Sequence, residues 1–208
     1  MITQTFKEFR FTCKVVLFIL ILVPLFLLFI DIVNNDLGPD PAKAMAHITG
    51  DWAMRLLLVT LAISPLRKLT GNTEWIHYRR MLGLFTFFYA SLHLLIYCFF
   101  LLGLEWRQLW ADVLDRPYIT VGFFAWVMLV PLAITSSKEW QRRLGRRWPQ
   151  LHRCIFISLL LALLHLIWQV RSDLCEALLY SFIALFLLSF RSRKILSGFR
   201  RLSQCSSK

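Results

Sequence analysis

Charge is scarce in this sequence, and acidic charge is scarcer still. Of the 208 residues, 17% are charged and 58% are hydrophobic, whereas soluble domains average about 25% charged and roughly 45–50% apolar residues. The net charge of +12 arises because 24 basic residues face 12 acidic ones. These basic residues lie between apolar runs and not on the face of a polar domain, so nucleic-acid binding is not indicated. The composition predicts an integral membrane protein.

Sequence motifs that hold cofactors or metals are also missing. The five cysteines show no CxxC or CxxCH spacing, which argues against a disulfide framework, a thiolate metal site and covalent c-type haem attachment. No GxGxxG follows a predicted strand, so we expect no soluble flavin or nicotinamide domain. We see no internal repeat, and the longest loops, at roughly 20 residues, are too short for a second domain.

Long apolar runs, in contrast, are abundant. A membrane-spanning helix needs about 20 residues, and a lipid-exposed strand or loop would leave its backbone polar groups unpaired. We therefore predict an all-α fold, a polytopic membrane helix bundle that forms a single integral membrane domain over residues 1–208. Its six predicted transmembrane helices are residues 15–30, 52–66, 81–104, 118–135, 151–170 and 174–190.

The basic residues predict how the bundle is oriented. Nineteen of the 24 Lys and Arg residues fall on one side, in the N-terminus, the 67–80 and 136–150 loops with Arg153, and the tail from Arg191. Nine of the 12 acidic residues fall on the other side. The positive-inside rule then places both termini in the cytoplasm. The first apolar run is too long for a signal peptide, so we expect an uncleaved first helix.

Two of the five histidines, His93 and His165, lie deep within predicted spans. They follow the cytoplasmic starts of their helices by about 12 and 14 residues, which is nearly the same depth at about 1.5 Å per residue. An intramembrane histidine is costly unless it is paired, ligated or placed in a polar cavity. Hydrogen bonding to neighbouring helices is one explanation. The sharper prediction is that both ligate one haem iron edge-on between two helices, which would pass electrons and not activate a substrate.

The position of His152 differs from that of the other two. It precedes His165 by 13 residues, about 20 Å along and some 140° around an ideal helix. We therefore do not expect it to face the same groove unless the helix is distorted. Its counterpart on the third span falls near Arg79 or Arg80, whose guanidinium groups could bind haem propionates in a two-pronged fashion. Ordinary anchoring at the membrane surface is the alternative for both arginines.

Three stretches resemble the MsrQ family of bacterial haem-binding membrane subunits. RRMLGL, followed by FFYASLHLLIY, resembles the third helix of that family. RRLGRRWPQLHRCIFISLLLALLHLIWQV resembles its fifth helix with the preceding loop, and DPAKAMAHITGDWAMRLLLVTLAISPLRKLTG resembles its second-helix region. The family is similar to the membrane domain of ferric reductases and NADPH oxidases. The resemblance therefore implies a ferric-reductase-like, haem-binding bundle in which His93, His152 and His165 ligate b-type haem.

The resemblance also implies a function. Members carry haem b and FMN and pass electrons from the quinone pool to a periplasmic molybdopterin catalytic subunit, MsrP, which reduces methionine sulfoxide in oxidised envelope proteins. We thus expect an electron relay in the bacterial inner membrane, with the sulfoxide chemistry on the partner. One haem is the base case, because the third span lacks a second histidine, and a second haem near His152 stays open.

Two other classes of protein stay open as alternatives. One is a multi-span transporter that uses His93 and His165 in a proton relay. That class predicts helices broken at the midplane, but Pro24, Pro65 and Pro131 form no matched pair of interruptions. The other is a scaffold protein whose histidines only pack against neighbouring helices.

Overall fold

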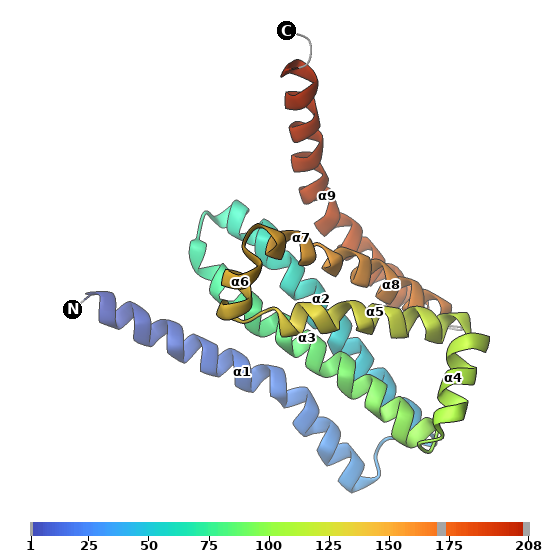
Figure 1. Ribbon diagram of the computed structural model, residues 1–208. Helices are drawn as coiled ribbons and strands as arrows, with labels where there is room; N and C mark the ends of the chain where they lie inside the picture. The colour runs from blue at the N-terminus through green and yellow to red at the C-terminus, as the bar shows by residue number, and fades with distance from the viewer. Residues whose placement is uncertain (1, 170–173, 206–208) are drawn as a thin grey trace.

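The structure, a computed structural model, describes residues 2–169 and 174–205 (Figure 1). This part of the chain is almost entirely helical and contains no strand, which confirms the all-α prediction. Its long helices are α1 (Ile2–Asn34), α2 (Pro41–Thr70), α3 (Ile76–Ile96), α5 (Pro117–Ile134), α8 (Cys154–Gln169) and α9 (Leu174–Cys205). Shorter elements connect them: η1 (Thr73–Trp75), the π-helical turn η2 (Tyr97–Leu101), α4 (Trp106–Asp115), α6 (Lys138–Leu144), η3 (Gly145–Arg147) and α7 (Trp148–Leu151).

The second helix begins well before the predicted residue 52. The Asp40 side chain accepts a hydrogen bond from the backbone N–H of Lys43, and Pro41 occupies the first turn, so the chain enters the helix at this point. Pro65 lies inside α2 without ending it. The helix continues to Thr70 and stops at Gly71, whose φ of 68° suits a left-handed C-cap.

The helices give most of the predicted membrane spans directly. Glu8–Asn34, Pro41–Thr70, Thr73–Leu101 and Pro117–Ile134 are long and apolar enough to cross a bilayer. A fifth candidate is a bent pair, in which Lys138–Leu151 and Cys154–Gln169 meet at 49°. Leu174–Phe190 is apolar but shorter. Among the described residues, the structure thus supports four or five spans. The sixth stays a prediction, and Val170, the predicted end of the fifth span, lies outside the described residues.

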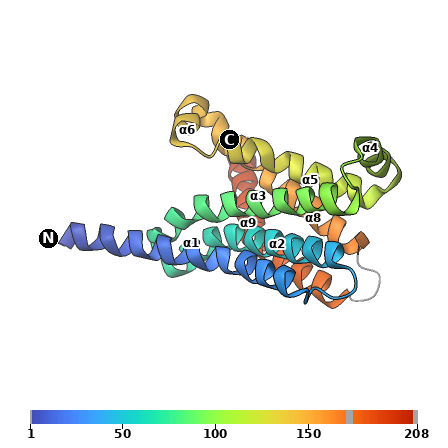
Figure 2. The same ribbon diagram turned by 90° about the horizontal axis from the view of Figure 1, so that it is seen from below.

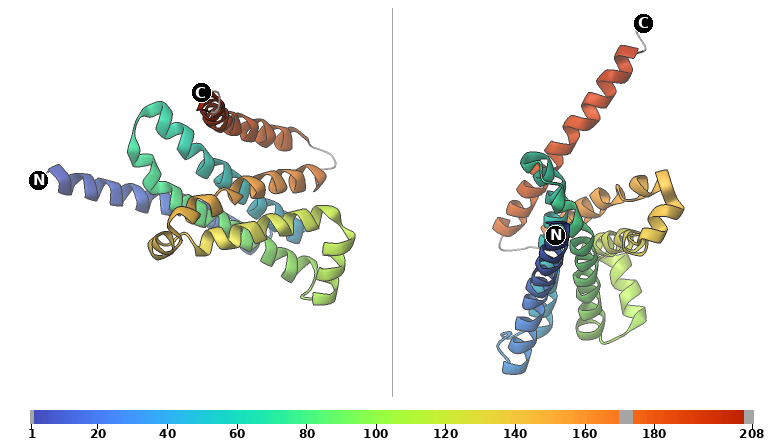
Figure 3. Two further views of the ribbon diagram at one scale, coloured as in Figure 1. Left: turned by 45° about the horizontal axis from the view of Figure 1, so that its top comes forward. Right: turned by 90° about the vertical axis from the view of Figure 1, so that its left-hand side faces the viewer.

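Two pairs of helices form the centre of the bundle. Helix α2 packs along α3, and α5 packs along α8, giving two helical hairpins that face each other (Figure 2). Helix α1 covers the first hairpin, and α9 lies against α2 and α8. Helices α4 and α6 extend from opposite ends of the bundle (Figure 2). The C-terminal part of α9 projects away from the bundle (Figures 1 and 3). The space between the hairpins is therefore enclosed by four helices.

Apolar side chains cover much of the outer surface. A soluble protein seldom exposes so many large apolar side chains, whereas a lipid-facing bundle must. The exposed set on the two outermost helices includes Phe18, Leu20, Phe26 and Phe29 of α1, and Leu178, Leu179, Phe182 and Leu185 of α9. Together with the candidate spans, this surface confirms a membrane helix bundle.

One basic side chain within the apolar part of α2 has partners on another helix. Arg55 donates from Nε to the Tyr180 hydroxyl at 2.8 Å and from a terminal nitrogen to Glu176 at 3.1 Å. Tyr180 in turn donates to the same Glu176 carboxylate at 2.8 Å. A charge in an apolar layer is costly unless it is paired. The cluster of Arg55, Glu176 and Tyr180 therefore ties α2 to α9.

Candidate functional site

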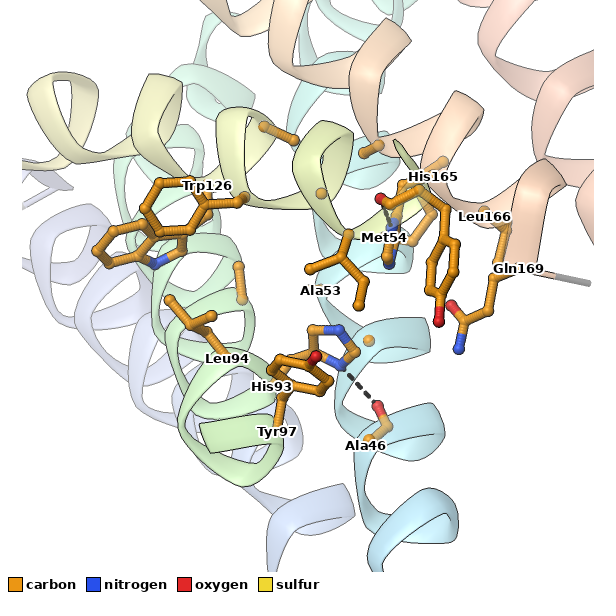
Figure 4. Close-up of a pocket in the computed structure, with 18 of the residues that line it drawn as sticks. Ala46, Ala53, Met54, His93, Leu94, Tyr97, Trp126, His165, Leu166 and Gln169 are labelled. Atoms are coloured by element: carbon orange, nitrogen blue, oxygen red, sulfur yellow. Dashed lines mark hydrogen bonds between the residues drawn. The ribbon is translucent and has the colours of Figure 1, made fainter. Parts of the chain in front are cut away.

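His93 and His165 meet between the two hairpins. His93 lies three residues before the end of α3, and His165 lies four residues before the end of α8. Their ring centroids are 6.2 Å apart, and the ring planes make an angle of 78° (Figure 4). The predicted juxtaposition of these two rings is present. Both lie near the ends of their helices and not midway along them, because α3 ends at Ile96 and α8 at Gln169.

Each imidazole is fixed by one hydrogen bond from Nδ1 to a backbone carbonyl of the partner helix. In the first hairpin, Nδ1 of His93 lies 2.8 Å from the carbonyl oxygen of Ala46. In the second, Nδ1 of His165 lies 2.7 Å from that of Tyr118. A carbonyl oxygen can only accept, so Nδ1 carries the proton and donates it. Each neutral ring is left with its Nε2 lone pair, which is the atom that a metal would bind.

A glycine lies beside each ring, one helical turn after the carbonyl that accepts the bond. A Cβ added at Gly50 would lie 3.1 Å from Nδ1 of His93, and one added at Gly122 would lie 2.7 Å from Nδ1 of His165. Real Cβ atoms essentially never approach another heavy atom as closely as the second distance. The absence of a side chain at both positions therefore lets each imidazole lie against the backbone of the facing helix.

The same arrangement thus occurs twice along the chain. A shift of 72 residues relates Ala46 to Tyr118, Gly50 to Gly122 and His93 to His165. Each histidine also lies 47 residues after its carbonyl partner. The sequence shows no evident internal repeat, yet the two hairpins repeat a carbonyl, a glycine and a histidine at the same spacing. Ala53, Leu57, Ala90, Leu92 and Leu94 also recur at the same shift, but such common apolar residues do not stand out in an apolar sequence.

A cavity of about 520 Å³ lies between the hairpins and is lined by both histidines. Its inner wall is formed by side chains from all four helices, including Leu57, Thr86, Leu129 and Ser158. The polar and charged residues at the other end include Lys43, His47, Arg116 and Gln169. Ligand cavities usually have about 300–1,000 Å³ of space and a largely apolar lining. The volume suits one large, mostly apolar ligand.

The donor set fits an iron that a planar macrocycle already holds. Among the described residues there is no group of three or more His, Cys, Asp or Glu side chains that could hold a bare metal ion. A porphyrin supplies four nitrogens and needs only two axial ligands. With metal–imidazole bonds of about 2.0 Å, two imidazoles on opposite sides of one metal have centroids roughly 6 Å apart. The observed separation of 6.2 Å agrees with that requirement.

Comparison with known proteins identifies the family. Residues 49–164, more than half of the chain, match the family described as ferric reductase like transmembrane component. The chain is 53% identical over 174 residues to the protein-methionine-sulfoxide reductase heme-binding subunit MsrQ of Xanthomonas campestris pv. campestris (strain B100), covering 84% of this chain and 80% of that protein. The MsrQ proteins of Xanthomonas euvesicatoria pv. vesicatoria (strain 85-10) and Xanthomonas oryzae pv. oryzae (strain MAFF 311018) are 52% and 50% identical with the same coverage. The chain belongs to the MsrQ family. No solved structure matches the chain.

For this MsrQ family member, the structure places the third predicted ligand apart from the other two. His152 lies in a bend between α7 and α8, not within a regular helix, and it is not among the residues that line the cavity. Its Nε2 lies 3.2 Å from the Thr135 hydroxyl, and its ring stacks on Trp148 with centroids 4.1 Å apart. The chain from His152 to His165 is thus not one regular helix, contrary to the expectation from the sequence, yet His152 still does not line the cavity. Its role as a ligand stays a prediction.

The two predicted propionate-binding arginines lie at the same end of the bundle as His152. Arg79 and Arg80 are in the first turn of α3, far from His93 near its end. Neither lines the cavity, although the charge of Arg79 acts on the His152 ring. The shift of 72 residues that relates the hairpins also relates Arg80 to His152. The predicted role of Arg79 and Arg80 in this MsrQ family member therefore belongs to the His152 end of the bundle, and it stays a prediction.

Proposed function

We propose that this protein is a haem b-containing electron-transfer subunit with His93 and His165 as the two axial ligands of one iron. The observation that carries the proposal is the pair of imidazoles, each anchored through Nδ1 and both lining one cavity. Membership of the MsrQ family, whose relatives are named heme-binding subunits, supports the same ligand. Bound between two histidines, the iron supplies one-electron oxidation and reduction with no open coordination position.

The residues of the chain then have three tasks. The carbonyl groups of Ala46 and Tyr118 keep the proton on Nδ1 and so keep Nε2 available as a ligand. Gly50 and Gly122 allow the rings to approach the backbone. The buried apolar side chains at the inner wall, such as Leu57 and Leu129, exclude water from the cavity. The first two tasks hold the rings in one geometry, and the third keeps their surroundings apolar.

We further propose the path on either side of this relay. Electrons come from the quinone pool and go to MsrP, a periplasmic molybdopterin subunit that carries out the sulfoxide chemistry and repairs oxidised envelope proteins. The protein lies in the bacterial inner membrane with six spans and both termini in the cytoplasm, as the distribution of basic residues supports. In that orientation the histidine pair lies near the periplasmic ends of α3 and α8. A second haem and the FMN implied by the family resemblance stay predictions.

The first experiment is to purify the protein in mild detergent and to record visible spectra before and after reduction with dithionite. We expect a sharp reduced α-band and one haem per chain. Two haems per chain would give His152 a ligand role. A colourless protein, even after haem supplementation, would instead favour the proton-relay or scaffold alternative.

The axial ligands are tested by substitution. His93→Ala and His165→Ala should each abolish the low-spin haem spectrum, because one axial bond is lost in each. His77→Ala is the matched control, since His77 contacts Arg10 and Glu74 at the far end of α3 and does not line the cavity. A low-spin spectrum that persists in both cavity variants would overturn the ligand assignment. Electron transfer to MsrP is tested in membranes, where methionine sulfoxide should reoxidise the reduced partner.

A further inference from the structure

The two ends of the cavity differ in what they can offer to a ligand. At the inner wall, Leu57 and Leu129 are buried. The two hydroxyl groups there are already used, because Thr86 donates to the carbonyl of Leu82 and Ser158 donates to that of Ala125, each at 2.9 Å. This end therefore has no cation and no spare hydroxyl donor for an anionic group, which would be costly to bury there.

Among the described residues that line the cavity, the Lys and Arg residues both lie at the opposite end. Lys43 lies in the first turn of α2, and Arg116 directly precedes α5, so each hairpin contributes one cation. Their side chains are 66% and 53% exposed, which identifies this end as the mouth of the cavity. The cavity thus has a polar mouth, defined by Lys43 and Arg116, and a closed apolar end.

Neighbouring acidic groups hold both cations at the mouth. Asp40 lies 2.6 Å from the Lys43 ammonium, and Asp112 lies 3.4 Å from Nε of Arg116. Asp112 is buried and also accepts a hydrogen bond from the Tyr97 hydroxyl at 2.6 Å, so it is a rigid support. The Arg116 side chain also interacts with Tyr118, and its guanidinium has five N–H donors to share among these partners and a ligand. The mouth therefore places the N–H donors of one Lys and one Arg beside the cavity, each positioned by a carboxylate.

One acidic side chain also lines the cavity and must be considered. Asp51 lies two helical turns along α2 from Lys43, where it interacts electrostatically with Arg55, Glu176 and His47. Its charge thus belongs to the cluster that joins α2 to α9. The two basic side chains that line the cavity lie at the mouth and not beside Asp51.

We propose that the two carboxylates of the bound porphyrin point to the mouth and are bound there by Lys43 and Arg116. This inference rests on the proposed function. Haem b is a flat apolar ring with two propionates on one edge, and a ring ligated by His93 and His165 can place that edge at only one polar end. Lys43 and Arg116, and not Arg79 or Arg80, are the propionate-binding residues of this cavity. They set the rotation of the ring about the axis between the histidines.

The test compares two porphyrins that differ only in these carboxylates. The full-length protein, purified from haem-deficient cells, is titrated with iron protoporphyrin IX or with its dimethyl ester, and binding is followed by the low-spin spectrum. The wild type should bind the free acid at least about tenfold more tightly. Lys43→Gln and Arg116→Gln should each reduce that preference about three- to tenfold, because partly exposed charge pairs contribute modestly. The double variant should bind both porphyrins almost equally, with an unchanged spectrum.

The matched control is Arg107→Gln, which removes an exposed charge on α4 that does not line the cavity. It should keep the wild-type preference. Equal binding of the two porphyrins by the wild type, or an undiminished preference in the double variant, would overturn the inference. If neither porphyrin gave a low-spin spectrum with the wild type, the proposed function would be overturned instead. The wild-type comparison needs no substitution, so a misfolded variant cannot remove the test.

Discussion

At His93 and His165, the Nδ1 atom that bonds to the backbone affects metal binding as much as the Nε2 atom that would bind the metal. The Nδ1 bond to a backbone carbonyl fixes the tautomer and makes the ring a stronger ligand. If both rings bind one iron as proposed, the same kind of partner would strengthen both bonds in the same sense. A more basic ligand would stabilise the oxidised iron, which would favour a donor of electrons over an acceptor.

The glycines give the first prediction at this scale. Gly122→Ala should lose most of the low-spin haem, because the new Cβ would lie 2.7 Å from Nδ1 of His165 and displace that ring. Gly50→Ala should lose less, since its Cβ would lie at 3.1 Å. Gly83→Ala is the matched control on α3, where the nearest atom is a Thr60 methyl carbon at an ordinary 3.7 Å. Haem content per chain measures all three. Full retention in Gly122→Ala would show that His165 does not need this approach.

The second prediction concerns His152. His152→Ala should reduce the haem content less than either cavity variant, because His152 bonds to Thr135, stacks on Trp148 and does not line the cavity. The comparison uses pyridine haemochrome assays on the three purified variants. Equal loss in all three would mean that His152 also ligates iron, and one haem per chain would then be the wrong count.

At the scale of elements, the order and type of the helices followed from apolar runs of about 20 residues. The ends of the helices were harder to predict. Asp40 and Pro41 start α2 eleven residues before the predicted start at residue 52. The apolar run does not include this polar first turn, so hydrophobicity alone does not predict it. The bend at His152 and the carbonyls that face the histidines depend on how helices pack, which one sequence does not specify. The pairing of His93 and His165 was predictable because both helices run in the same direction.

The third prediction belongs to the contact between α2 and α9. Arg55→Leu should lower the melting temperature in detergent by roughly 2–4 °C, equivalent to about 1 kcal/mol for a partly exposed pair in a chain of this length. Glu176→Leu in the same chain should recover part of that loss, because it removes the acid that lost its partner. Arg67→Leu, an exposed position at the far end of α2, is the control and should change the melting temperature little. Strictly additive losses for Arg55 and Glu176 would contradict their coupling.

At the scale of the whole molecule, the same fold must be oriented in a membrane. The fourth prediction uses two native cysteines, each kept as the only cysteine in a chain whose other four are serine. Cys175 is exposed at the start of α9 and should react with a membrane-impermeant maleimide on intact spheroplasts. Cys205, in the basic tail, should react only after the cells are lysed. The reverse pattern would invert the orientation and place the histidine pair at the cytoplasmic face.

The place of the histidines near the ends of α3 and α8 has an electrical consequence. A charge that crosses the whole bilayer changes energy by about 2.3 kcal/mol per 100 mV of membrane potential. With both termini in the cytoplasm, an electron leaving the histidine pair for a periplasmic acceptor crosses only a small part of that field. An electron that arrived from the cytoplasmic face would cross most of it, moving from the negative to the positive side. The energised state of the cell would therefore assist the filling of this site and leave its emptying almost unaffected.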